Sequence, residues 1–271
     1  MPAASPLTKL KLETLKVEMI EDEILRVTLD RPADANALNT QMARDLIRLF
    51  FQIEDDPGAA RVIVMTGSGE RFFCAGGDLK ERNGMTNEAW LAQHRLFERA
   101  FWAVVDCALP VIGAINGHAF GGGLEFALCC DFAYAAKEAR FALPEVKLGI
   151  MPGGGGTQNM NRAAGVRRAK ELVLTGREFT ADKGVAWNIF NEAYPRAELM
   201  DRVMETARMM AANAPISVRQ AKKAIQHGSQ MDLTRAFWFE IEAYNRMVFT
   251  EDRLEGVKAF NEKRKPKYKG K

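Results

Sequence analysis

The sequence lacks any long apolar run. No stretch of its 271 residues reaches the roughly 18–20 uncharged apolar positions that a membrane-spanning helix needs. The first twenty residues hold no apolar core of the kind found in signal peptides, and their two acids and missing arginine are unlike most transit peptides. We therefore expect a cytoplasmic protein that makes no contact with membranes.

Motifs that define several enzyme classes are missing as well. No pair of cysteines has CxxC spacing and no histidines form HxxxH or HExxH, so we predict buried reduced thiols and no metal site. There is no GxxxxGK[ST] and no GxSxG, and GGGGTQ has Gln158 where a dinucleotide-binding GxGxxG requires glycine. A nucleotide-dependent kinase and a Rossmann dehydrogenase are therefore disfavoured.

Positive charge is scarce except at one end. The composition is that of an ordinary globular protein, with 47% hydrophobic and 27% charged residues. The last ten residues, EKRKPKYKGK, carry six basic side chains and one acid, which leaves 32 basic against 34 acidic residues elsewhere. Such a tail is typical of a solvated chain end, the simpler interpretation, or of a contact with a polyanion.

Strand and helix patterns alternate over the first two-thirds of the chain. From about residue 180 onward the pattern is helical only, which predicts an α/β core followed by a helical region. No fixed-period repeat or long linker divides the chain. The segments with strand character are 24–30, 61–69, 110–115, 132–136 and 140–146.

Two glycine-rich stretches, CAGGD and FGGGLE, lie where a strand leads into a helix. The first N–H groups of a helix have no partner inside it and can bind a developing oxyanion. Two such donors that converge would form an oxyanion hole, and the enolate of a thioester is a suitable guest.

Two glutamates accompany the glycine loops. Glu125 and Glu145 lie in apolar surroundings, GLEFAL and ALPEVKLGI, where burial would raise a carboxyl pKa toward neutrality and suit it to proton transfer. One such glutamate alone is more simply explained as a capping or ion-pairing acid at the edge of the core. Two of them, each beside a glycine loop, favour catalysis.

The sequence resembles the crotonase (enoyl-CoA hydratase/isomerase) superfamily from about Ile24 to the C-terminus. The stretches that carry the resemblance are RPADANALN, FCAGGDLKE, INGHAFGGGLEFALCCDFAYAA, FALPEVKLGIMPGGGGTQ and EGVKAFNEKRKPKY. It implies a ClpP/crotonase-like α/β spiral of repeated strand–strand–helix units over 1–195. A C-terminal helical oligomerisation region with a basic tail would follow over 196–271, and would assemble a homotrimer or a hexamer.

The same resemblance implies the roles of individual residues. Gly77 and Gly122 would supply the oxyanion-hole N–H groups, Glu125 and Glu145 would handle the water and its protons, and Gly153 would line the water site. The residues implied to contact CoA are Ala35, Leu38, Ala75, Gly76, Asp78 and Leu79, with Phe260 and Lys263 reaching CoA on a neighbouring subunit.

The implied activity is an enoyl-CoA hydratase, a hydro-lyase of fatty-acid or branched-chain amino-acid catabolism that adds water syn across the 2,3-double bond. Acyl-CoA is the substrate and no further cofactor is expected. Another acyl-CoA reaction of the same fold, such as isomerisation or dehydration, is the alternative. CAGGDLKER and DRLEGVKAFNEKRKPKYKG most resemble the branch with 3-methylglutaconyl-CoA hydratase, the AU-rich-RNA-binding hydratase.

An RNA-binding protein is the interpretation from a different class. The helix TQMARDLIRLFFQIEDD offers only Arg44 and Arg48 where that branch has a lysine-rich face, so no nucleic-acid partner is expected. A second departure from the family is Asn159, in GGTQNMNR, where an arginine is usual.

Overall fold

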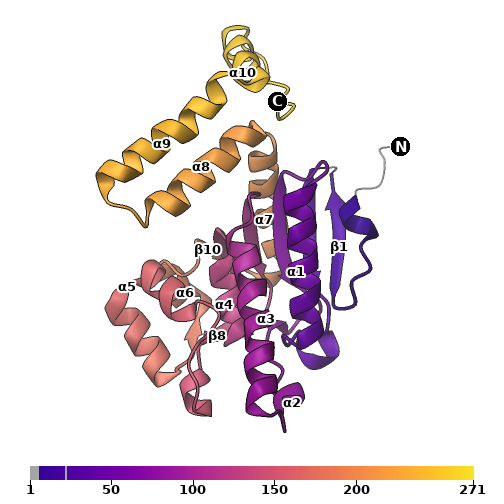
Figure 1. Cartoon of the computed structure of the whole chain (residues 1–271), viewed down its shortest axis with the longest axis vertical. Coiled ribbons are helices and arrows are strands. Elements are labelled where there is room, and N and C mark those ends of the chain that lie inside the picture. Colours follow the sequence, from indigo (N-terminus) through magenta and orange to yellow (C-terminus); the bar gives the residue numbers. More distant parts are fainter. Residues whose placement is uncertain (1–5, 22) are drawn as a thin grey trace.

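Two β-sheets form the centre of the molecule (Figure 1). The computed structural model describes residues 6–21 and 23–271. The larger sheet has the strand order β1-β2-β3-β5-β7-β10, with the β1–β2 pair antiparallel and the other pairs parallel. Its strands are β1 (Leu15–Ile20), β2 (Ile24–Leu29), β3 (Val62–Gly67), β5 (Val111–Ile115), β7 (Phe132–Ala136) and β10 (Glu192–Tyr194).

The smaller sheet has the order β4-β6-β8-β9. Each of three successive units sends one strand to the larger sheet, the next to the smaller sheet, and then forms a helix. This confirms the expected spiral of strand–strand–helix units. The strands of the smaller sheet are β4 (Phe72–Cys74), β6 (His118–Phe120), β8 (Arg140–Ala142) and β9 (Phe179–Thr180).

The helices begin where capping side chains and apolar spacing allow. Helix α1 starts at an N-cap, Asn39, whose side chain accepts a hydrogen bond from the Met42 N–H at 2.9 Å, and it buries one apolar face. It packs side by side with α3. The first helices are α1 (Thr40–Asp55), α2 (Leu79–Arg82), α3 (Asn87–Val105), α4 (Gly122–Cys129), α5 (Gly156–Thr175) and α6 (Ala181–Ala186), and the short 3₁₀ turns are Pro6–Lys9, Pro32–Asp34 and Glu145–Leu148.

Helix α4 is buried on nearly every side and lies against strand β4. A Cβ added to Gly123 would lie 2.0 Å from the carbonyl oxygen of Cys74, so only glycine permits this approach. The close packing brings the beginning of α4 to the end of β4. All four cysteines are buried and free, as the sequence predicts.

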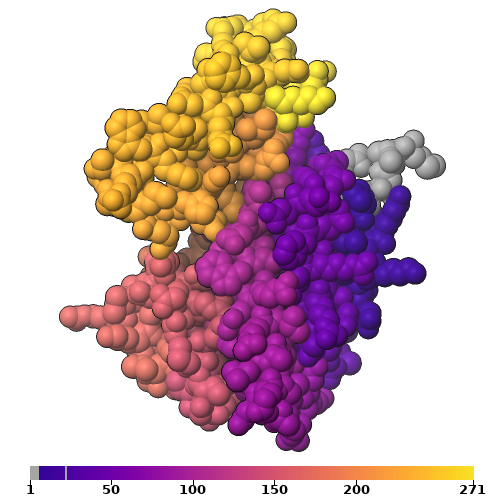
Figure 2. Space-filling model, viewed as in Figure 1, coloured from indigo at the N-terminus to yellow at the C-terminus, as the bar shows by residue number. Residues whose placement is uncertain are grey.

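The C-terminal helices divide into two groups. Helix α7 (Arg196–Ala211) buries its apolar face against β3, β5 and β7, so it packs with the core although it follows the boundary expected at 195. Helices α8 (Pro215–Gly228), α9 (Leu233–Val248) and α10 (Glu251–Asn261) extend away from the sheets and form the upper lobe in Figure 2. Across the described ranges, no helix is long and apolar enough to cross a membrane.

The prediction that only helices follow residue 180 is wrong at β10. Its three residues, Glu192–Tyr194, pair with β7, and β9 ends at Thr180. So short a strand shows no period of its own and exists because a partner strand is in place. Strand β1 was not predicted either. It is the outer strand of the sheet, with an irregular burial pattern.

Candidate active site

The two glycine-rich loops, CAGGD and FGGGLE, meet at one place. The backbone of Leu38 forms hydrogen bonds with the residues on either side of Gly77. The Leu38 N–H donates to the Gly76 carbonyl at 2.7 Å, and the Leu38 carbonyl accepts from the Asp78 N–H at 2.9 Å. The Gly77 N–H consequently points away from Leu38. The two loops are close together here, because a Cβ built on Gly122 would lie 3.7 Å from the Gly77 nitrogen. Within the described residues, neither the Gly77 nor the Gly122 N–H donates a hydrogen bond.

Gly76 has the backbone conformation that this approach needs. Its φ of +98° is one that side-chain-bearing residues rarely adopt, and a Cβ there would lie 2.7 Å from the Phe120 carbonyl oxygen. The loop after β4 can therefore lie flat against the loop after β6. Two N–H groups without partners, side by side at the edge of a cavity, are the arrangement that stabilises a developing oxyanion.

Glu125 is held by the glycine loop that precedes α5. Its Oε1 accepts hydrogen bonds from the Gly154 N–H at 2.7 Å and the Gly156 N–H at 2.8 Å, and the side chain is buried. Burial raises the pKa of this carboxyl, while the N–H groups of the loop oppose the rise. One carboxyl oxygen is thereby fixed, and the other oxygen is left for a substrate or a water.

Glu145 lies at the start of the 3₁₀ turn after β8, and its side chain is buried. Neither of its carboxyl oxygens has a hydrogen-bond partner in the part of the chain that the structure describes. Burial raises its pKa to about 7, and the charge of Glu125 nearby adds to the rise. A carboxyl with such a pKa exchanges protons readily near neutral pH.

Both glutamates and both glycines line one cavity of about 470 Å³. Apolar residues of α3 and of the loop before α5, among them Phe97, Phe101 and Met151, form much of the remaining wall. Of the residues implied by the resemblance, those that line this cavity are Leu38, Ala75, Gly76, Gly77, Leu79, Gly122, Glu125, Glu145 and Gly153.

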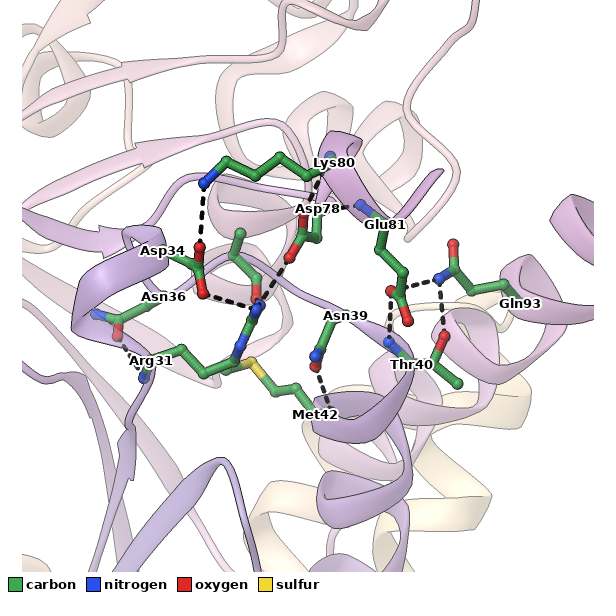
Figure 3. A network of polar contacts seen from close by, with 11 residues as sticks. Arg31, Asp34, Asn36, Asn39, Thr40, Met42, Asp78, Lys80, Glu81 and Gln93 are labelled. Atoms are coloured by element: carbon green, nitrogen blue, oxygen red, sulfur yellow. Dashed lines mark hydrogen bonds and ion pairs between the residues drawn. The ribbon is translucent and has the colours of Figure 1, made fainter. Parts of the chain in front are cut away.

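Ala35 and Asp78 are not among the lining residues and have structural contacts instead. The Ala35 carbonyl accepts from the Ala75 N–H at 3.0 Å. Asp78 caps α2 and forms an ion pair with Arg31 at 3.0 Å, in the network of Figure 3. Its carboxylate pKa stays below the ordinary value despite burial, because the α2 N–H groups and Arg31 stabilise the charged form. Both residues shape the loop that carries Gly77.

Phe260 lies in the last turn of α10 and Lys263 follows the end of this helix, and neither residue lines the cavity of its own chain. Phe260 is 84% exposed. The tail beyond them is not a free solvated end, because it folds back on α10. Asp252 accepts hydrogen bonds from the Lys269 and Gly270 N–H groups at 2.7 and 2.8 Å.

Sequence reasoning missed two polar residues of the cavity wall, Arg82 and His94. His94 contacts Glu98 at 3.3 Å and packs where a Cβ on Gly153 would lie. Arg82 ends α2 four residues after Asp78. One signal was available, because Arg82 lies on the helix that directly follows the CAGGD loop and His94 lies on the next helix.

Comparisons with known proteins identify the family of the chain. The sequence model described as enoyl-CoA hydratase/isomerase matches residues 19–271. The chain therefore belongs to the enoyl-CoA hydratase/isomerase family, and it is an enzyme of that family.

Individual relatives match over nearly their whole length. The chain is 38% identical over 245 residues to the short-chain-enoyl-CoA hydratase of Clostridium acetobutylicum, covering 90% of this chain and 94% of that protein. It is 37% identical over 252 residues to the carnitinyl-CoA dehydratase of Escherichia coli, covering 91% and 95%. The crystal structure of enoyl-CoA hydratase from Bacillus anthracis superposes with a TM-score of 0.93 at 40% identity, covering 96% of this chain and all of that one.

Proposed function

We propose that the protein is an enoyl-CoA hydratase that adds water syn across the 2,3-double bond of an acyl thioester. The observation that carries this proposal is the pairing of two buried carboxyls with two N–H donors around one cavity. An isomerisation needs one group that moves a proton, whereas hydration must both activate a water and protonate C2. Two glutamates in different hydrogen-bonding surroundings suit these two tasks.

The thioester oxygen would accept hydrogen bonds from the Gly77 and Gly122 N–H groups. A water between Glu125 and Glu145 gives one proton to a carboxylate while its oxygen bonds to C3. The π electrons of the C2–C3 bond shift toward the thioester oxygen, whose enolate charge the two N–H groups stabilise. A carboxyl then delivers a proton to C2, which completes the addition. The Glu145 pKa of about 7 fits a group that both accepts and donates a proton.

We propose that the assembly is a homotrimer or a hexamer, and that Phe260 and Lys263 reach CoA bound to a neighbouring copy. Large exposed apolar side chains on α8, α9 and α10 support such assembly, because a monomer rarely leaves so many in water. The proposed reaction uses carboxyls and backbone amides and needs no metal, flavin or nicotinamide.

The test is a panel of enoyl-CoA thioesters that differ in chain length and branching, followed by loss of the enoyl absorbance. Turnover of crotonyl-CoA or a relative is expected. Glu125→Gln and Glu145→Gln should each lose roughly 10²–10⁴-fold in kcat while they bind acyl-CoA nearly as the parent does. The double variant should lose less than the product of the two, because both groups act on one water. Near-normal turnover by either single variant would remove the assignment, and double-bond migration without hydration would favour an isomerase.

A further inference from the structure

The glycine loop before α5 lies directly against helix α3. A Cβ added to Gly153 would lie 2.5 Å from Cε1 of His94, and one added to Gly154 would lie 2.4 Å from Cε2 of Phe101. Only residues without a Cβ permit contacts this close. Two side chains of α3 therefore touch the backbone of the loop, with nothing between them.

The same loop holds the carboxyl of Glu125. The Gly154 and Gly156 N–H groups donate to its Oε1 at 2.7 and 2.8 Å. Burial raises the pKa of Glu125, and the N–H groups of the loop, that of Gly153 included, oppose the rise. Any movement of the loop relative to α3 would therefore change both the place of this carboxyl and its affinity for a proton.

The two contacts with α3 differ in how firmly they are held. Phe101 is buried and its ring centroid lies 4.5 Å from that of Phe126, so the core fixes it. His94 lines the cavity and its side chain is 35% exposed. Its Nε2 lies 3.3 Å from Oε1 of Glu98, one turn further along α3, and the ring turns its Cε1–Nε2 edge toward Gly153. At this end the loop depends on one polar ring at the edge of the cavity.

We propose that His94 is a positioning residue, whose ring holds the Gly153 backbone in place and so keeps the N–H groups of the loop directed at Glu125. The effect on turnover rests on the proposed function, because it requires that Glu125 handles the water. A misplacement of about 1 Å near reacting groups can cost on the order of 10²-fold in rate. The ring acts through the loop and need not touch the substrate.

The kinetic test removes the ring and then replaces it. His94→Ala should lower kcat for crotonyl-CoA roughly 10- to 100-fold and change KM less, because the loop moves while the CoA contacts remain. His94→Phe keeps a flat ring against Gly153 and should retain most of the parent kcat. Arg95→Ala, an exposed neighbour on α3 that does not line the cavity, is the control and should match the parent. Equal losses of kcat in His94→Ala and His94→Phe would overturn the proposal.

A size exchange tests whether His94 acts through Gly153. Gly153→Ala should lower kcat in the parent, since its Cβ meets the His94 ring. In the His94→Ala background that space is open, so the double variant should be at least as active as His94→Ala alone. Losses that multiply would show that the two residues act independently, and would contradict the proposal.

A titration without turnover separates this inference from the proposed function. The protein is labelled with ¹³C at the side-chain carboxyl of glutamate, and the Glu125 signal is assigned by its loss in Glu125→Gln. Its titration midpoint should move to higher pH in His94→Ala, because the loop N–H groups no longer oppose the rise of the pKa as well. It should stay at the parent value in His94→Phe, which keeps the ring and carries no charge.

The outcomes of this titration are distinct. An unchanged midpoint in His94→Ala would overturn the proposal, and so would equal shifts in both variants, which would make the charge of His94 responsible instead of its packing. If the midpoint shifts only in His94→Ala and the parent hydrates no ester, the positioning role stands and the hydratase assignment fails. If the parent hydrates crotonyl-CoA and His94→Ala changes neither kcat nor the midpoint, the positioning role fails and the hydratase assignment stands.

Discussion

The burial of Glu145 should make the stability of the protein depend on pH. Its pKa rises from an ordinary 4.5 to about 7 on folding, because its carboxyl is removed from water and receives no hydrogen bond within the described residues. A pKa difference of one corresponds to about 1.4 kcal/mol. The folded protein therefore binds a proton that the unfolded chain has already released between these two pH values.

The direction in which stability changes with pH follows from this difference in bound protons. The stabilisation from the protonated carboxyl is fully present below pH 4.5 and is lost as the pH rises through about 7. Glu145→Gln carries no titrating group there. The stability of the variant relative to the parent should thus increase by about 3 kcal/mol between pH 4.5 and pH 8.

The assay is urea unfolding followed by tryptophan fluorescence, at equal protein concentration and at several pH values across this range. Only the pH dependence of the difference is interpreted, because the new amide also changes packing by a constant amount. Glu70→Gln, which removes an exposed carboxylate, is the control and should show no such trend. A difference between Glu145→Gln and the parent that stays constant with pH would show that Glu145 is solvated in the folded protein, and would remove its role in proton transfer near neutrality.

Three further predictions test other parts of the molecule. Gly77→Pro should lower kcat by a factor that corresponds to about 3–4 kcal/mol, because proline has no N–H to donate. Gly77→Ala should be milder, because it keeps the donor and the nearest atom to its Cβ is 3.6 Å away. Equal losses of kcat in two folded variants would show that steric clash, not the missing N–H, causes the loss. Gly123→Ala should unfold at markedly lower urea than the parent, since its Cβ would lie 2.0 Å from the Cys74 carbonyl oxygen, and an unchanged midpoint would contradict that packing. Lys263→Gln should raise KM for acyl-CoA more than it lowers kcat. The increase in KM should become smaller as the salt concentration rises, because an exposed charge is screened within roughly 8–10 Å. The same KM as the parent at low salt would contradict a contact between Lys263 and CoA.

Local sequence was enough to single out the main residues of the candidate site. Glycine runs at strand-to-helix junctions indicate exposed N–H groups, and Glu125 and Glu145 stand out as acids in apolar segments. The structure brings these residues to one cavity. The alternation of strand and helix patterns likewise predicted an α/β core, because each element carries its own period, whereas the spiral of strand–strand–helix units was implied by the family resemblance.

Tertiary packing determined several features of the structure that local sequence patterns do not encode. The strand β10 exists through pairing with β7, and α7 belongs to the core because its apolar face meets the sheet. Asp78 has a motif position that suggests CoA, yet its carboxylate caps α2 and pairs with Arg31.

Arg82 shows the same limit most clearly. In the sequence it is one basic residue among many, and only the tertiary fold places its guanidinium over the rings of Trp90 and Phe97 and in hydrogen-bond contact with Gln93. Sequence patterns carry the preferences of a residue for its near neighbours along the chain. The free energy of a charged side chain depends on groups that are distant in sequence and close in space, so the fold alone determines the surroundings of Arg82.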